Sequence, residues 1–262
     1  MFSTMMKILD RWWRALADLL LPRVCLVCER KLGLHEEHIC IYCLADMPLT
    51  HFWERRHNPM ADKINALIQE ELCTKMEGQF HGRPDTEARE RYAYASALFY
   101  FQNEEAYRHI LYSIKYKGNT PAGEYFGKIF GKKMARADYF SDIDVVIPVP
   151  LHWTRKWSRG YNQAECIAKT LTIELGAQLR TDILHRHRKT STQTRLGIEQ
   201  KSKNVQGAFE AIAPESIPKH ILLIDDVFTT GSTLFACYQA LRKAYPQGVR
   251  ISFATLGYVG RA

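Results

Sequence analysis

The chain alternates short apolar runs with longer amphipathic segments, and this pattern predicts an α/β protein. Ile221–Ile224 contains no polar residue, which is typical of a strand buried on both faces of a parallel sheet. Segments in which apolar residues recur every three or four positions predict helices between such runs. The expected strands are Tyr94–Phe101, Asp144–Val149, Gln178–Leu184, Ile221–Ile224 and Arg250–Thr255. The expected helices are Met60–Lys75, Ala106–Lys115, Phe126–Ala137, Ala164–Leu175 and Leu234–Ala244. Alternating strands and helices indicate a doubly wound parallel sheet.

Changes in pattern along the chain predict four regions. These are an N-terminal amphipathic helix (1–22), a small cysteine-containing module (23–50), a helical linker (51–91) and the main α/β domain (92–262). The linker ends in a polar segment with glycine and proline, Gly78–Arg91. A length of 262 residues accommodates one sizeable domain with a small appendage.

The first 22 residues do not have the pattern of a signal peptide. Trp12-Trp13-Arg14 and Asp18 interrupt the apolar run that such a peptide requires. No stretch approaches the ~20 apolar residues of a membrane span. We therefore expect a cytoplasmic protein whose N-terminal helix packs on the protein itself, and docking on a membrane surface is the alternative.

A net charge of +8 fits a polyanionic ligand or nucleic acid. The basic residues are not gathered in one run, however, so a solvated basic surface is the simpler explanation. Charge alone does not choose between these partners.

Four of the seven cysteines form two C-x-x-C pairs, which predicts a structural zinc site. The pairs are Cys25/Cys28 and Cys40/Cys43, and each turn directs two thiolates at one centre. His35 and His38 lie in the connecting loop, but four sulfurs already complete a tetrahedron. A redox pair or disulfides are the alternatives, and neither is expected in a cytosolic protein.

Two acids and a hydroxyl-rich loop follow the apolar run Ile221–Ile224. Asp225 and Asp226 are expected at the carboxyl end of the strand, where open α/β sheets bind ligands. The backbone and hydroxyl groups of the loop can surround one anion at the start of the next helix. The loop residues are Thr229, Thr230, Gly231, Ser232 and Thr233. This combination suits a sugar phosphate, and an ordinary strand–turn–helix connection with solvated aspartates is the alternative.

Three other segments carry candidate ligand-binding residues. Ile147-Pro-Val-Pro150 is a stiff loop followed by the cations Arg155, Lys156 and Arg159, which suit pyrophosphate. Arg159–Glu165 offers amides in Asn162 and Gln163, with a helix cap as the alternative. Arg186–Phe209, which includes Arg188, is long, polar and basic, and suits a mobile lid, with a surface loop as the alternative.

The run Ile221–Thr233 resembles the phosphoribosyl pyrophosphate (PRPP) motif of type I phosphoribosyltransferases. Taken with the other motifs, the chain resembles the ComF family over nearly its whole length. The shared features are L-P-x-x-C before the paired C-x-x-C motifs, Lys115-Tyr116, I-P-V-P, R-G-Y-N-Q, R-x-T-x-x-Q and D-D-V-x-T-T-G-S-T. The resemblance implies a type I phosphoribosyltransferase fold joined to an N-terminal zinc-binding module, and a link to DNA uptake or to the use of DNA as a nutrient.

These features lead to the hypothesis of a Mg²⁺-dependent, PRPP-binding phosphoribosyltransferase. Asp225 and Asp226 would hold the ribose hydroxyls, and Thr229–Thr233 would hold the 5′-phosphate. Family members are often described as resembling a glutamine-hydrolysing enzyme of purine synthesis. That enzyme uses a cysteine exposed after removal of Met1, whereas here Phe2 follows, so we do not expect a glutaminase.

The alternative is a non-catalytic adaptor in DNA uptake that senses PRPP or a nucleotide. It would bind single-stranded DNA, a helicase-like partner or competence proteins.

Overall fold

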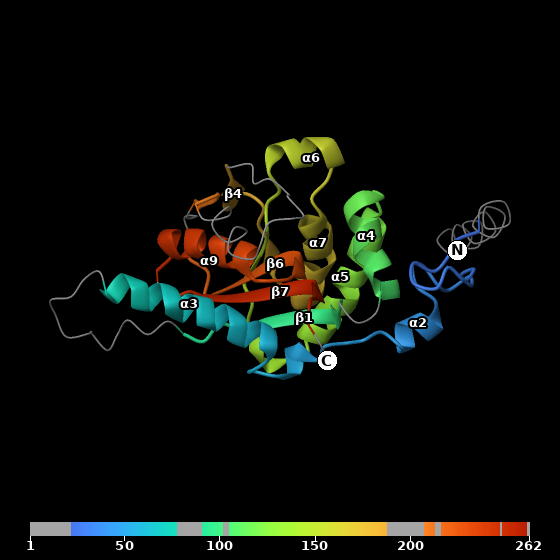
Figure 1. Cartoon of the computed structure of the whole chain (residues 1–262), viewed down its shortest axis with the longest axis horizontal. Coiled ribbons are helices and arrows are strands. Elements are labelled where there is room, and N and C mark those ends of the chain that lie inside the picture. The colour runs from blue at the N-terminus through green and yellow to red at the C-terminus, as the bar shows by residue number, and fades with distance from the viewer. Residues whose placement is uncertain are drawn as a thin grey trace, which may run out of the picture.

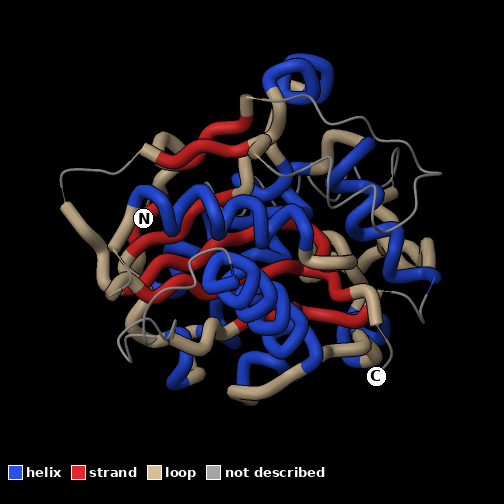
Figure 2. The backbone as a smooth tube through the Cα atoms, turned by 60° about the vertical axis from the view of Figure 1, so that its left-hand side comes forward, coloured by secondary structure: helices blue, strands red, loops and turns tan. Residues whose placement is uncertain are grey.

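A five-stranded parallel sheet with helices on both faces forms the centre of the protein (Figure 1, Figure 2). The computed structural model describes residues 22–77, 91–101, 105–187, 207–212, 216–246 and 248–260. Within them, the strand order of the sheet is β1-β7-β6-β2-β3, and all four neighbouring pairs are parallel. The predicted α/β fold class with a parallel sheet is therefore confirmed.

The elements follow the predicted alternation of strands and helices. The sheet strands are β1 (Ala95–Tyr100), β2 (Val145–Pro148), β3 (Gln178–Leu179), β6 (His220–Phe228) and β7 (Arg250–Tyr258). A separate antiparallel pair consists of β4 (Leu184–Arg186) and β5 (Phe209–Ala211). The α-helices are α2 (Ile41–Ala45), α3 (Pro59–Glu77), α4 (Arg108–Tyr116), α5 (Thr120–Met134), α6 (Trp153–Arg159), α7 (Gln163–Leu175) and α9 (Ser232–Ala244). Short 3-10 helices are η1 (Phe52–Glu54), η2 (Glu105–Tyr107) and η3 (Asp138–Phe140).

Strand β6 shows why the central apolar run has no polar interruption. Ile221 and Leu223 pack in the buried cluster that contains α3 and α9. Leu222 and Ile224 pack in the opposite cluster, with α4, α5 and α7. Because successive side chains of a strand point to opposite faces, a central strand covered on both faces must be apolar at every position.

The N-terminal cysteine module packs against the α4/α5 side of the sheet. Cys25, Ile39 and Cys40 belong to the same buried cluster as residues of α4 and α5. Tyr107 Oη donates a hydrogen bond to the Cys43 carbonyl oxygen at 2.8 Å. The module is therefore joined to the larger domain by an apolar contact as well as by the chain.

One predicted strand and one predicted helix have different bounds in the structure. The strand expected at Gln178–Leu184 is divided between β3 and β4, which belong to different sheets. The side chains of Arg180 and Asp182 pair at 2.8 Å between them, in a polar connection that leaves the main sheet. Helix α5 begins six residues earlier than the predicted Phe126, because the Asn119 side chain accepts a hydrogen bond from the Ala122 N–H and caps it.

Helix α6 occupies a segment expected to be a loop. His152 caps its start through a hydrogen bond from the Thr154 N–H to the imidazole Nδ1. Gly160 ends the helix with φ of 78°. These two local signals explain a short helix that apolar periodicity does not reveal, since none of its residues is buried.

Several predictions fall outside the described residues. These are the N-terminal helix, the polar end of the linker and the lid from Arg188 to Gln206. Across the part of the chain that is described, no helix combines the length and apolarity needed to cross a membrane. The boundaries of the four regions remain predictions.

Candidate functional site

The two acids lie within β6 rather than beyond its end. The predicted strand ended at Ile224, but β7 continues to pair with β6 as far as Phe228. Strand β2 stops pairing at Ile224, where it is opposite Pro148. Asp225 and Asp226 therefore lie just after the point where β6 stops pairing with β2. Because successive side chains of a strand alternate, theirs point to opposite faces of the sheet.

Asp226 is buried and pairs with a lysine that the analysis of the sequence did not assign to the site. Its side chain is 5% exposed, and its Oδ1 lies 3.0 Å from Nζ of Lys115 at the end of α4. The second oxygen, Oδ2, is buried and has no hydrogen-bond partner among the described residues. An unpartnered buried carboxylate oxygen is costly, so this position suits a hydroxyl or other donor from a ligand.

Asp225 lies on the other face, in surroundings that favour its neutral form. Burial raises the pKa of Asp225 to about 7, and the negative charge of Asp226 acts in the same direction. Its Oδ1 accepts a hydrogen bond from the Asp226 N–H at 2.8 Å. Burial also lowers the pKa of Arg186, and the nearby charge of Arg155 adds to this effect. Arg186 and Asp225 influence one another electrostatically, so these charged groups share one neighbourhood.

The predicted phosphate loop connects β6 to α9. Gly231 precedes α9 with φ of 83°, a conformation that side chains rarely adopt. A Cβ atom at this position would lie 2.9 Å from Phe228 Cζ. The hydroxyl oxygens of Thr230 and Ser232 are 2.9 Å apart. A small hollow at the loop is lined by Asp225, Val227, Phe228, Thr229, Gly231, Ser232, Thr233 and Leu234.

A second lysine approaches this loop from a distant part of the chain. Lys63 on α3 donates a hydrogen bond from Nζ to the Thr229 carbonyl oxygen at 3.3 Å. It belongs to the region expected to be a linker, and helical spacing was its only signal in the sequence. The positive charge of Lys63 would stabilise an anion bound by the loop.

The three predicted pyrophosphate cations are distributed around α6. Arg155 lies near enough to Arg186 to affect its pKa. Arg159 donates from Nη1 to Gln163 Oε1 at 3.2 Å, and its guanidinium carbon lies 5.1 Å from the Tyr116 ring centre. Lys156 is exposed on a different side of the helix, in a hollow between two tryptophans. Of the three cations, Arg155 is thus the one near Arg186, which itself affects the pKa of Asp225. Arg188 is outside the described residues.

The alternative reading of Asn162 as a helix cap is confirmed. Its Oδ1 accepts from the Ala164 N–H at 3.1 Å, at the start of α7. Its Nδ2 donates to the Val149 carbonyl oxygen at 3.0 Å. Both groups of this buried amide hold the loop after β2 against α7.

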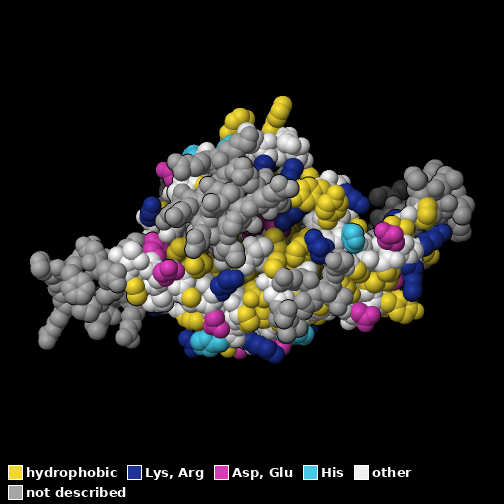
Figure 3. Space-filling model, viewed as in Figure 1, with side chains coloured by type: hydrophobic (Ala, Val, Ile, Leu, Met, Phe, Trp, Pro, Cys, Tyr) yellow, Lys and Arg dark blue, Asp and Glu magenta, His cyan; other side chains and the backbone are white. Residues whose placement is uncertain are grey.

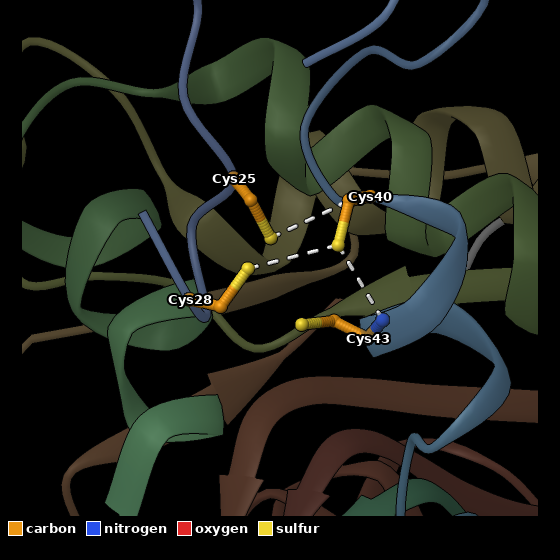
Figure 4. A group of neighbouring side chains, drawn as sticks. All are labelled: Cys25, Cys28, Cys40 and Cys43. Atoms are coloured by element: carbon orange, nitrogen blue, oxygen red, sulfur yellow. Dashed lines mark hydrogen bonds between the residues drawn. The ribbon is translucent and has the colours of Figure 1, made fainter. Parts of the chain in front are cut away.

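The four cysteines of the two C-x-x-C pairs converge on one point (Figure 4). Their sulfur atoms all lie within 4.8 Å of one another. Sγ of Cys28 and Sγ of Cys40 are 3.7 Å apart. A tetrahedron with metal–sulfur bonds of ~2.3 Å has sulfur–sulfur separations of about 3.8 Å. The four free thiols therefore fit a zinc ion, and this group could hold one.

The surroundings of the cysteines shift their pKa values in different directions. Burial raises the pKa of Cys25, but hydrogen bonds from the backbone of Cys28, Cys40 and Val27 outweigh it and lower the pKa to about 7. Burial raises the pKa of Cys43, and hydrogen bonds between its protonated thiol and neighbouring cysteine side chains act in the same direction. Four thiolates at this spacing require a cation, since the backbone stabilises only part of their charge.

The chain is similar to curated proteins that are named for competence and for DNA utilization. It is 36% identical to "Competence protein F" of Haemophilus influenzae over 110 residues, which cover 41% of this chain and 48% of that protein. It is 32% identical to "DNA utilization protein YhgH" of Escherichia coli K12 over 108 residues, 41% of this chain and 47% of the relative. The protein of the same name from Shigella flexneri is 36% identical over 98 residues, 37% and 43% of the two chains. No family model matches the chain. The chain spans about half the length of the curated relatives that it matches.

Proposed function

We propose that this chain is a PRPP-binding, phosphoribosyltransferase-like member of the ComF family with a role in DNA uptake or use. The relatives' names support the biological role, because they describe competence and DNA utilization. The motif resemblance supports the ligand.

One observation carries the proposal: an unpartnered oxygen of a buried acid lies on the strand that leads into the glycine-containing loop. Asp226 Oδ2 can accept a hydrogen bond from a ribose hydroxyl. A few residues later, Gly231 turns the backbone into the start of α9, where N–H groups favour a phosphate. A ribose with a 5′-phosphate combines these two chemistries in one molecule.

The chain's residues would bind and orient PRPP for substitution at the ribose C1. In this reaction the bond from C1 to the pyrophosphate oxygen breaks, pyrophosphate leaves with the electron pair, and the acceptor supplies the pair for the new bond. Asp225 and Asp226 would stabilise the positive charge that develops on the ribosyl ring. Lys63 would attract the 5′-phosphate, and Arg155, Lys156 and Arg159 would receive the pyrophosphate.

Two metals belong to the proposal. Mg²⁺, bound with PRPP, would supply neutralisation of the pyrophosphate charge. Zinc would be held by Cys25, Cys28, Cys40 and Cys43, where four sulfurs leave no open position for substrate. The role of the zinc would therefore be structural.

Calorimetric titration of the protein with PRPP and Mg²⁺ tests the ligand. We expect micromolar binding that is lost in the Asp225→Asn/Asp226→Asn variant. The matched control is Glu124→Gln/Asp182→Asn, which removes two carboxylates that pair with Lys169 and Arg180 elsewhere on the protein. This control should bind PRPP with the affinity of the wild type. Absence of PRPP binding by the wild type would contradict the proposal.

Release of pyrophosphate separates the enzyme from the non-catalytic adaptor. Both readings predict PRPP binding at the same site. Only the enzyme releases pyrophosphate faster than free PRPP decays when candidate acceptors are supplied. Binding without release across nucleobases, amines and phosphate esters would favour the adaptor.

A further inference from the structure

Helix α6 presents two tryptophans to solvent, which is unusual for such large apolar side chains. Trp153 is 69% exposed and Trp157 is 88% exposed. They are four positions apart, so they lie on one side of the helix. An open hollow of about 650 Å³ is lined by Trp153, Lys156, Trp157 and Gly160. Figure 3 shows hydrophobic side chains projecting from the top of the molecule, where Figure 1 places α6.

A second group of exposed aromatic residues lies on α4, next to α6. Tyr112 and Tyr116 are 50% and 63% exposed, and their ring centres are 5.0 Å apart. Lys117 Nζ lies 5.9 Å from the Tyr112 ring centre. The guanidinium carbon of Arg159 on α6 lies 5.1 Å from the ring centre of Tyr116, so this arginine links α6 to the aromatic residues of α4. We name Tyr112, Tyr116, Lys117, Trp153, Lys156 and Trp157 the α6–α4 surface.

The charged side chains of α4 and α6 are all basic. Helix α6 contains Arg155, Lys156 and Arg159 and no acidic residue. Helix α4 likewise has no acid, and Lys115 and Lys117 stand at its end. A surface of flat apolar rings interleaved with cations complements a polyanion that exposes flat apolar faces. Single-stranded nucleic acid has this chemistry, whereas a duplex hides the faces of its bases.

We propose that the α6–α4 surface binds single-stranded nucleic acid, with bases stacked on the tryptophans and phosphates paired with Lys156 and Lys117. This inference goes beyond the ribose-phosphate site and does not depend on it. The surface uses residues that the PRPP proposal leaves exposed, apart from Lys156. Stacking on aromatic rings is tolerant of sequence, so we expect no strong preference among bases.

Fluorescence anisotropy with a labelled 20-nucleotide oligo-dT tests the stacking contacts. Trp153→Ala/Trp157→Ala should weaken binding by about tenfold or more. The conservative variant Trp153→Phe/Trp157→Phe should retain most of the affinity, because phenylalanine also stacks. The matched control is Tyr42→Ala, which removes an exposed aromatic ring beside Arg30 on the cysteine module. Equal affinity of the alanine variant and the wild type would overturn the proposal.

The salt dependence tests the phosphate contacts. Lys117→Gln/Lys156→Gln should reduce the slope of log affinity against log salt by about 1.4, since each phosphate contact to a single strand contributes about 0.7. An unchanged slope would overturn the phosphate assignment. A duplex of the same length should compete poorly, and competition equal to that of oligo-dT would show charge-driven binding instead of stacking.

Two further measurements separate this proposal from the PRPP site. Asp225→Asn/Asp226→Asn should lose PRPP and keep oligo-dT, while Trp153→Ala/Trp157→Ala should keep PRPP and lose oligo-dT. In the wild type, oligo-dT should protect tryptophan fluorescence from iodide quenching. Protection by anionic vesicles and none by oligo-dT would assign the surface to a membrane and overturn the proposal.

Discussion

Neighbouring aspartates of β6 have different environments because a strand turns successive side chains to opposite faces. Asp226 pairs with Lys115, which compensates for its burial. Asp225 has the charge of Asp226 beside it, and its pKa is raised by burial and by that charge. The neutral form of Asp225 is thus the form that folding of the unliganded protein favours.

This shift predicts stability that decreases as pH rises. The ordinary pKa of the carboxyl is 3.8 and the folded value is about 7, so the folded state retains a proton that the unfolded chain loses. The stabilisation is complete below pH ~4 and is lost as pH rises through ~7, at no more than about 1.4 kcal/mol per pH unit. Urea unfolding at pH 5 to 8 should show a steeper decrease for the wild type than for Asp225→Asn. Parallel pH profiles of the two proteins would contradict the assignment.

The Lys115–Asp226 pair predicts a large cost when one partner is removed. Lys115→Met leaves a buried carboxylate without its cation and should lower the free energy of unfolding by roughly 3 kcal/mol. Lys115→Met/Asp226→Asn should recover most of this loss, because the unpaired charge is gone. Denaturant unfolding measures both.

The control for this cycle is Lys169→Met. Lys169 pairs with Glu124 at 2.8 Å, but the two side chains are 62% and 37% exposed. Removing an exposed pair should cost much less than removing one partner of a buried pair, because solvent screens the charges. Equal losses of unfolding free energy for Lys115→Met and Lys169→Met would show that burial gives the Lys115–Asp226 pair no special importance for stability.

At the scale of elements, the connection from β6 to α9 depends on one backbone conformation. Gly231→Ala places a Cβ at positive φ and 2.9 Å from Phe228 Cζ. We expect a loss of roughly 2 kcal/mol in unfolding free energy and weaker PRPP binding. Gly248→Ala is the matched control, because nothing lies within 4 Å of its Cβ position. Calorimetry with PRPP and thermal unfolding would measure both effects, and identical behaviour of the two variants would exclude a special role for Gly231.

At the scale of the whole molecule, the cysteine module and the sheet share one buried cluster. Loss of the metal should therefore destabilise more than the module. Cys25→Ser should reduce zinc content from one equivalent to about none and lower the unfolding midpoint by roughly 5–10 °C. Cys73→Ser, at an exposed cysteine of α3, is the control and should change neither. Full zinc content in Cys25→Ser, measured by elemental analysis, would refute the ligand set.

Local pattern determined the elements that depend on burial and on backbone conformation. The apolar run of β6 predicted a doubly covered strand, and the spacing of the C-x-x-C pairs predicted four sulfurs close together. These features can be recognised in the sequence because periodicity and turn geometry involve residues only a few positions apart. Helix α6 and the division of Gln178–Leu184 were missed because polar caps and turns, not apolar periodicity, define them.

The sequence by itself determined the α/β class, the position of the central strand and the grouping of the cysteines. Only the tertiary structure decided which cations approach the acids and the loop. Lys63 contacts Thr229 across 166 positions, and Lys115 reaches Asp226 from a helix on one face of the sheet. It also decided that Trp153 and Trp157 stay in solvent. These outcomes depend on the strand order and on which helix faces remain uncovered, and no local spacing encodes either.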